Sequence, residues 1–344
     1  MEETYFLGAN SRAGFASLYR DFAAAPGDLL HVVKGGPGTG KSGFMRRIAE
    51  AAKERGLDAE LVLCSGDPAS LDGVYVPALR QGWMDGTAPH TRDPAHFGAD
   101  GDYVDLGRFC RLPLCGDDRE RVLALNAAYR SRYADAYRWL AAAGALEDAA
   151  APPPLPAAAR EKLRRRFRSI LRRSAPCGEG GGGESRRFLS ALSGGGRLRL
   201  PLPARYRTVC RIDSPRGLAP ALLGIAAEEA AARGLTRILC LSPLEPARTE
   251  ALLLPEAGLA FLGGRAGEGE RGMHPDALLP PEDGAARSAR RRAVRLRDEA
   301  LASAEAALRQ AKALHDELEA VYRPYMDFPA LTSFTEETLA RIFR

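Results

Sequence analysis

The sequence predicts an α/β protein made of two tandem copies of one domain, each with a parallel sheet flanked by helices and each ending in long C-terminal helices. Three observations predict this class. A glycine-rich loop near residue 40 stands between an apolar run and a helical pattern, the surrounding region repeats at a spacing of 178 residues, and a long helical pattern follows each copy. With 344 residues, the chain is long enough for two domains with sizeable cores.

The loop at residues 35–42 fits the pattern G-x-x-x-x-G-K-[ST], the Walker A sequence of phosphate-binding loops. The apolar run at 29–34 predicts a strand before it, and the periodicity of 41–55 predicts a helix after it. Glycines let backbone N–H groups surround an anion, and the helix N-terminus attracts negative charge. The expected ATP-binding residues are Gly35, Gly36, Pro37, Gly38, Thr39, Gly40, Lys41 and Ser42. We expect Lys41 to contact the β- and γ-phosphates and Ser42 to bind Mg²⁺. The expected fold is therefore a P-loop NTPase-like domain, which the second copy repeats in degenerate form. A glycine-rich turn without a ligand is the alternative, which the flanking strand and helix disfavour.

The internal repeat aligns some fifty residues of the two copies without gaps. Arg55-Gly56-Leu57 falls on Arg233-Gly234-Leu235, and Trp83-Met84 falls on Phe261-Leu262. With small insertions the match extends to both flanks, for example from Phe6-Leu7-Gly8 to Phe188-Leu189-Ser190. The repeat divides the chain into a first copy with a helical tail, a glycine-rich linker and a second copy with a helical tail, at residues 1–175, 176–186 and 187–344.

The second copy is predicted to have lost its phosphate loop. At the spacing of the repeat, Lys41 falls on Ala219, Ser42 falls on Pro220, and the last glycine of the loop falls on a leucine. Asp213 falls where the first copy has Gly35, and its carboxylate would repel phosphate. We therefore expect one nucleotide site in the chain.

The remaining elements follow from periodicity and helix breakers. Strands are expected at 59–64 and 81–85, and Gly56 is expected to end the helix of 41–55. Helices are expected at 119–146, where apolar and tyrosine side chains form one stripe, and at 157–173 beyond a proline-rich break. A third long helix, at 286–322, packs either on the matching helix of the first copy or within its own domain.

Asp85 closes the third predicted strand, where a carboxylate can hold Mg²⁺ through water beside Ser42. The alternative is a turn role, since Asp-Gly is a common turn dipeptide. Gly86 follows, whereas many ATPase motors carry at that place the glutamate that activates water. Glycine at this position argues against a motor ATPase with fast turnover and favours slow hydrolysis.

Three further residues are candidates for catalysis. Asp67 and Asp72 lie in the loop expected after the second strand, where ligands sit in open α/β sheets. Either could act as a general base, or could serve an Asx turn or a helix cap. His90 follows the third strand and could sense the γ-phosphate, although a solvated loop histidine is the more common case.

Composition limits the classes of function. The chain has 45% hydrophobic and 27% charged residues, no apolar run of membrane-spanning length and no signal-peptide pattern at its start, so we expect a cytoplasmic protein with no membrane partner. Its six cysteines lack a zinc spacing. Basic runs at 160–173 and 287–297 contain no regular pattern of aromatics, with Phe167 as their single aromatic residue, which favours solvated helix faces over a nucleic-acid surface.

Several short motifs together resemble a family of uncharacterised bacterial tandem P-loop proteins, usually labelled ATPase or nucleotide kinase. They are the loop at 35–42, Ser70-Leu71-Asp72-Gly73, residues 85–90, Leu314-His315-Asp316-Glu317 and Tyr325-Met326-Asp327-Phe328. The resemblance covers essentially the whole chain and implies a duplicated P-loop domain that binds ATP with Mg²⁺. Members of the family keep a phosphate loop in both copies, from which this second copy departs.

The sequence thus favours a Mg²⁺-dependent ATP-binding protein that hydrolyses ATP slowly at its first loop. A nucleotide or small-molecule kinase is the first alternative, because the loop and the Asp85-Gly86 strand end also resemble those of adenylate-kinase-like enzymes. No arginine-rich lid pattern accompanies them, and the acceptor, whether protein or small molecule, is not defined by the sequence. A non-catalytic binding module switched by nucleotide is the second alternative, and a nucleic-acid-stimulated ATPase is the third.

Overall fold

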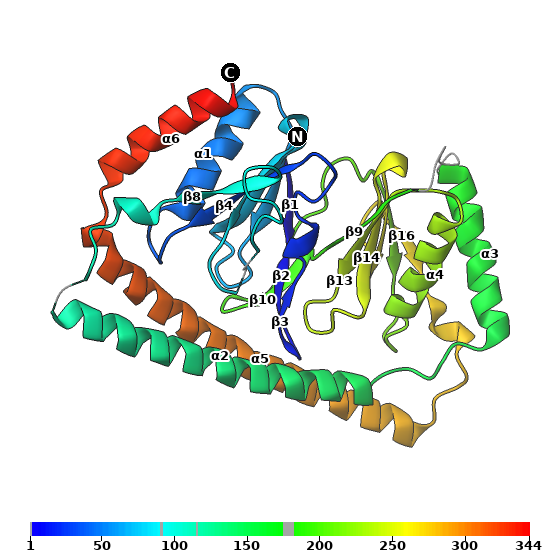
Figure 1. The fold of residues 1–344 in the computed structure, drawn as a ribbon. Coiled ribbons are helices and arrows are strands. Elements are labelled where there is room, and N and C mark those ends of the chain that lie inside the picture. Colours follow the sequence, from blue (N-terminus) through cyan, green and yellow to red (C-terminus); the bar gives the residue numbers. More distant parts are fainter. Residues whose placement is uncertain (1, 90–91, 115, 175–181) are drawn as a thin grey trace.

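A computed structural model describes residues 2–89, 92–114, 116–174 and 182–344 and contains two six-stranded sheets (Figure 1). The first sheet has the order β1-β5-β6-β7-β4-β8, and the second has the order β16-β12-β15-β14-β13-β9. The strands of the first sheet are β1 (Glu2–Phe6), β4 (Leu29–Lys34), β5 (Ala59–Leu63), β6 (Leu71–Val76), β7 (Gln81–Asp85) and β8 (Gly101–Asp105). Those of the second are β9 (Glu184–Arg187), β12 (Thr208–Ile212), β13 (Arg237–Leu241), β14 (Thr249–Leu254), β15 (Leu259–Gly263) and β16 (Arg271–Met273).

Each copy adds a small hairpin, three helices and short 3-10 turns. The hairpins are β2 (Gly8–Ser11) with β3 (Gly14–Ser17), and β10 (Ser190–Ser193) with β11 (Gly196–Arg199). The helices are α1 (Lys41–Glu54), α2 (Asp117–Ala149), α3 (Ala157–Ser174), α4 (Ala219–Ala231), α5 (Gly284–Tyr322) and α6 (Phe328–Ile342). The 3-10 turns are η1 (Tyr19–Asp21), η2 (Pro77–Leu79), η3 (Gly107–Phe109), η4 (Pro255–Ala257), η5 (Pro275–Leu278) and η6 (Arg323–Tyr325). Among these described elements, no helix combines the length and the apolar character needed to cross a bilayer.

The prediction of a parallel sheet is confirmed only in part, because both sheets are mixed. β6 runs antiparallel to both of its neighbours, β5 and β7, and β14 does the same in the second copy. The connection from β5 to β6 is only residues 64–70, whereas a parallel crossover needs about a dozen residues or more. The other strands of the first sheet are parallel, including β4 between β7 and β8.

The two copies meet around a local two-fold relation. Phe6 and Phe188, which occupy matching positions of the repeat, exchange two backbone hydrogen bonds of 2.9 Å each. A pair in which equivalent residues contact each other is the mark of an isologous interface, as in two-fold symmetric dimers. The two sheets therefore stand side by side with β1 and β9 between them (Figure 1).

The long helices α2 and α5 pack against each other along their length, below both sheets in Figure 1. Val122 near the start of α2 packs with Leu318 and Val321 near the end of α5, so the two helices are antiparallel. Leu140, further along α2, packs with Ala300 and Ala304. Of the two arrangements left open by the sequence, the long helix of the second copy thus adopts the pairing with its counterpart.

The last helix of each copy packs on the sheet of the other copy. Leu163, Phe167 and Leu171 of α3 lie in the core of the second sheet beside α4. Leu331 and Leu339 of α6 lie in the core of the first sheet beside α1. Figure 1 shows α6 beside α1 and α3 beside α4. The chain therefore has the form of a domain-swapped dimer joined into one polypeptide.

Candidate functional site

The phosphate-binding pattern adopts a loop between a buried strand and a helix, as its sequence predicts. β4 ends at Lys34, and α1 begins at Lys41. Gly38 and Gly40 have φ values of 69° and 85°, in the left-handed region that favours glycine. A Cβ atom at Gly40 would also lie 2.7 Å from the Leu331 Cδ2 of α6, so the close approach of that helix adds a second requirement for glycine.

Lys41 is folded into the loop that precedes it. Its Nζ donates hydrogen bonds to the carbonyl oxygens of Gly35 at 2.9 Å and Gly36 at 2.8 Å, and its side chain is 11% exposed. The same Nζ lies 3.7 Å from Asp85 Oδ2. The ammonium group is therefore inside the loop, where it can exchange carbonyl oxygens for phosphate oxygens without leaving its place.

Asp85 lies beside the loop because its strand, β7, pairs in parallel with β4. The register places Asp85 opposite Val33 at the carboxyl ends of both strands. Its Oδ1 accepts hydrogen bonds from the Thr87 backbone N–H at 2.8 Å and from the Thr87 hydroxyl at 2.6 Å. One carboxylate oxygen thus holds the turn, while the other faces Lys41 at the site.

Ser42 and Asp85 provide the oxygen donors expected of a magnesium site. Ser42 Oγ accepts a hydrogen bond of 2.9 Å from the Leu71 backbone N–H, which fixes the hydroxyl and leaves a second lone pair. A serine hydroxyl and a carboxylate are hard oxygen ligands of the kind that Mg²⁺ takes, usually with several waters and substrate phosphates. The donor set therefore fits Mg²⁺ bound together with a nucleotide.

Asp72 lies on β6 and is 4% exposed. It accepts a hydrogen bond of 2.8 Å from the Tyr19 hydroxyl. Burial, followed by the charge of Asp72, raises the pKa of Tyr19 well above its usual value, so the phenol keeps its proton and remains a donor. Burial and then Asp72 likewise raise the pKa of the Cys64 thiol. The structure thus places Asp72 in a buried polar cluster, one residue beyond the Leu71 amide that binds Ser42.

Asp67 lies in the loop before β6 and stabilises a turn. Its carboxylate accepts hydrogen bonds of 3.3 Å from the Ala69 backbone N–H and the Ser70 hydroxyl. It also lies 3.4 Å from Lys312 Nζ of α5, so it links the first copy to the long helix of the second. His90, the residue expected to sense the γ-phosphate, lies outside the described residues.

Sequence reasoning did not foresee that α5 and α6 cover the phosphate loop. A Cβ atom at Gly38 would lie 3.1 Å from the Glu319 carbonyl oxygen, and one at Gly36 would lie 3.8 Å from the Tyr322 ring. Gly40 similarly faces Leu331 of α6. Three glycines of the loop therefore face α5 or α6, the helices that come after the second sheet in the sequence. The motifs at 314–317 and 325–328 lie near this contact in the sequence, but they do not indicate that α5 and α6 approach the loop.

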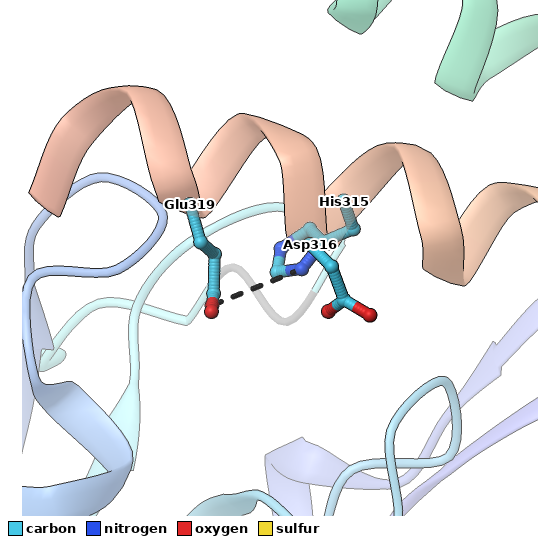
Figure 2. A group of neighbouring side chains, drawn as sticks. All are labelled: His315, Asp316 and Glu319. Carbon is cyan, nitrogen blue, oxygen red and sulfur yellow. Dashed lines mark ion pairs between the residues drawn. The ribbon is translucent and has the colours of Figure 1, made fainter.

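A small polar cluster lies on the last part of α5 (Figure 2). His315, Asp316 and Glu319 place their donor atoms within 4.8 Å of one another, and His315 Nδ1 lies 3.8 Å from Glu319 Oε1. Lys312 forms an ion pair with Asp316 and lies near Asp67 as well. Lysine already balances the carboxylate charge here, so the cluster is an ion-pair network of α5 rather than an assigned metal site.

In the second copy, the loop at 213–220 matches the phosphate loop of the first copy. Its donors are occupied by a carboxylate of the second copy itself. Asp276, in η5, accepts hydrogen bonds from the Ser214 hydroxyl and, at 3.0 Å, from the Arg216 backbone N–H. The Leu218 backbone N–H donates to Ser214 Oγ at 2.9 Å. Backbone donors that would face a phosphate in a working loop therefore already have an internal acceptor.

We accordingly expect one nucleotide per chain. Isothermal titration of the full-length protein with ATP and Mg²⁺ should give a stoichiometry of one, because the second loop lacks a lysine and already contains the Asp276 carboxylate. A stoichiometry of two would contradict this reading of the second copy.

Comparison with known proteins assigns no relative to this chain: no family model, no curated protein and no solved structure matches it significantly. The chain consists of two similar α/β domains with mixed six-stranded sheets, and its functional interpretation depends on the geometry of the first loop.

Proposed function

We propose that the protein binds ATP with Mg²⁺ at residues 35–42 and hydrolyses it slowly. The observation that carries this proposal is the arrangement of Lys41 and Asp85. The lysine is 11% exposed within the glycine loop, and its Nζ lies 3.7 Å from a carboxylate at the end of the adjacent parallel strand. A glycine loop, a helix N-terminus, a lysine and a neighbouring acid are the parts that P-loop enzymes use on a nucleoside triphosphate.

Each residue has a defined task in this proposal. The backbone N–H groups of the loop surround the phosphates, and Lys41 turns from the Gly35 and Gly36 carbonyl oxygens to the β- and γ-phosphate oxygens. Ser42 and Asp85 hold the magnesium ion, which when bound neutralises charge on the phosphates. Asp85 keeps one oxygen for this purpose because Thr87 binds the other.

Slow turnover is favoured because no carboxylate of the described site is set aside to activate water. A Cβ atom at Gly86 would lie 2.3 Å from Val32 Cγ1, so the position after Asp85 has no room for the glutamate of motor ATPases. Asp67 holds a turn and lies near Lys312, and Asp72 accepts a hydrogen bond from buried Tyr19. A general base typically increases the rate by about 10²–10⁴-fold, and this site lacks most of that contribution.

The contact between the loop and α5 favours a nucleotide-dependent change between the two copies. Gly36 faces Tyr322, Gly38 faces Glu319 and Gly40 faces Leu331 of α6. A loop that rearranges around phosphate changes these contacts, and α5 extends from there along α2 and contacts strand β10 of the second copy. This observation supports the nucleotide-switched binding module as the second candidate function.

The experiment that tests the proposal measures ADP formation by the full-length protein with ATP and Mg²⁺, in wild type and in Asp85→Asn. We expect slow ADP release without any acceptor, and a reduction of about 10- to 100-fold in the apparent affinity for Mg²⁺ or in turnover on loss of the carboxylate charge. Asp298→Asn, an exposed carboxylate on α5, is the control and should behave as wild type.

The alternatives give different results in the same assay. ADP formed only after addition of a nucleoside monophosphate or another hydroxyl acceptor would indicate a kinase. Tight ATP binding without ADP would indicate the switched module. Turnover that is equal in Asp85→Asn and wild type, with and without Mg²⁺, would refute the magnesium assignment.

A further inference from the structure

A pocket of about 310 Å³ lies between α3 and the β12–β16 edge of the second sheet, away from the phosphate loop of the first copy. Three arginines line it, Arg166 and Arg173 from α3 and Arg271 from β16, together with Ser169, and all four residues are solvent-exposed. Its apolar wall is formed by Ile170, Met273 and the largely buried Cys210. The pocket therefore combines concentrated positive charge with a small apolar surface.

The three arginines, like Arg172 of α3, have no carboxylate partner among the described residues, whereas other arginines of that helix do. Arg164 and Arg168 of the same helix form ion pairs with Glu228 and Glu229 of α4, at distances of 2.8 to 3.2 Å. Arg166, Arg173 and Arg271 form no ion pair or hydrogen bond with any side chain in the part of the chain that the structure describes. Three like charges around one hollow repel one another, and an anion in it would relieve that repulsion.

The first copy has no arginine at the position that matches Arg271. Arg271 pairs with Cys210 of β12, and the repeat places Val32 at the position of Cys210. Val32 pairs with Tyr103 of β8, so a tyrosine occupies the position of Arg271. The Tyr103 ring instead contacts Lys34 and the ring of Phe97. The strand residue of the arginine pocket thus has no arginine counterpart in the first copy.

We propose that this pocket binds a small phosphate-bearing molecule, whose phosphate lies among Arg166, Arg173 and Arg271 and whose organic part rests on Ile170 and Met273. Guanidinium groups match phosphate oxygens with two parallel hydrogen bonds, and the Ser169 hydroxyl adds a further donor. A volume of 310 Å³ is at the small end of ligand pockets and suits a sugar phosphate or a diphosphate rather than a nucleic-acid strand. The proposal is independent of ATP binding at the first loop.

The position of the pocket gives such a ligand a structural effect. Arg166 and Arg173 belong to the helix that the first copy contributes, whereas Arg271 belongs to the second sheet. A phosphate held by both elements joins the exchanged helix to the sheet that it covers. Because the ligand binds the folded arrangement, it raises the thermal midpoint of the protein as its concentration exceeds its dissociation constant.

The test is calorimetric titration of the full-length Lys41→Ala variant, in which the first loop is disabled, with inorganic pyrophosphate and with ribose 5-phosphate. We expect saturable binding with one site for at least one of the two, weakening as sodium chloride is raised. Arg166→Gln and Arg271→Gln should each weaken it about tenfold or more, as expected for loss of a hydrogen bond between charged groups. Tighter binding of ribose 5-phosphate assigns a phosphate ester, and tighter binding of pyrophosphate assigns a diphosphate.

Arg172→Gln is the matched control, because Arg172 is an exposed arginine of α3 that does not line the pocket. Its affinity should equal that of the parent. Equal weakening by Arg172→Gln, Arg166→Gln and Arg271→Gln would show diffuse attraction to a basic helix and overturn the proposal. Absence of saturable binding, or preference for a single-stranded oligonucleotide over both small phosphates, would overturn it as well.

Should a glutamine variant fail to fold, Arg166→Lys and Arg271→Lys keep the charge and remove the planar fork. They should retain the thermal midpoint of the parent without ligand while binding the small phosphate more weakly. Undiminished binding in both lysine variants would contradict recognition by the guanidinium groups.

Discussion

Replacing Lys41 with alanine is expected to weaken ATP binding by roughly 30-fold to several thousandfold, which corresponds to a loss of about 2–5 kcal/mol. The lysine Nζ lies within the loop at 2.8 and 2.9 Å from two carbonyl oxygens, and it is the only lysine of that loop. Its removal leaves the phosphate charge without its nearest cation. Isothermal titration with ATP and Mg²⁺ measures the affinity, and the ADP assay measures the accompanying loss of turnover.

Lys53→Ala provides the control for this variant. Lys53 lies in the last turn of the same helix, is 70% exposed and is 3.6 Å from Glu2, so its loss removes a lysine without touching the loop. Its affinity for ATP should match that of wild type. An unchanged affinity in Lys41→Ala would refute the assignment of the nucleotide site, whatever the result for the control.

Phe167→Ala is expected to lower the free energy of unfolding by about 3–5 kcal/mol, the usual range for removal of a buried aromatic ring. Phe167 is fully buried, and its ring packs edge-on against Phe261 of β15 with centroids 5.4 Å apart. Because α3 covers the second sheet, the substitution opens a cavity in the core of the other copy. Denaturant unfolding followed by circular dichroism measures the loss.

The matched control is Phe97→Ala, because Phe97 is 71% exposed. Its removal should change the free energy of unfolding by about 0.5 kcal/mol or less, as is common for surface positions. If Phe167→Ala were as mild as Phe97→Ala, the packing of α3 on the second sheet would be contradicted. Greater protease sensitivity of α4 in Phe167→Ala would locate the damage in the second copy.

Features encoded by neighbouring residues could be predicted closely from the sequence. The strands expected at 29–34 and 81–85 have those bounds, and the helix expected at 41–55 ends one residue earlier. The internal repeat was also predicted accurately, because two copies of one fold keep their elements at the same spacing. β5 and β13, for example, occupy matching positions 178 residues apart. The local hydrophobic periodicity and the positions of glycines are sufficient to predict these elements.

Features that depend on distant residues could not be predicted in the same way. The lead-in before residue 18 forms β1 and a hairpin, and Gly101–Asp105 forms an edge strand, although neither segment has a strong period. The direction of β6 follows from the length of one loop, and the exchange of α3 and α6 follows from packing surfaces that both copies offer. In a repeat, equivalent helices present similar apolar faces, so the sequence alone does not determine which sheet receives which helix.

The same limit applies to the candidate site. Lys41, Ser42 and Asp85 could be proposed together because a strand-loop-helix unit and its neighbouring strand bring them to one edge of the sheet. Glu319 and Tyr322 could not, since nothing within α5 indicates that its last turns lie on Gly38 and Gly36. Asp67 and Asp72 were neighbours in one expected loop, yet the structure separates them into a turn and a buried strand.

The exchange of terminal helices also sets the order of events during synthesis on the ribosome. The strand, loop and helix of the phosphate site are translated before the second sheet, whereas α6, which closes the core beside α1, is translated after it. Domains usually fold in the order in which they are made. Here the core of the first domain is completed only after the second sheet has been translated, so the apolar surface that α6 covers stays open until then.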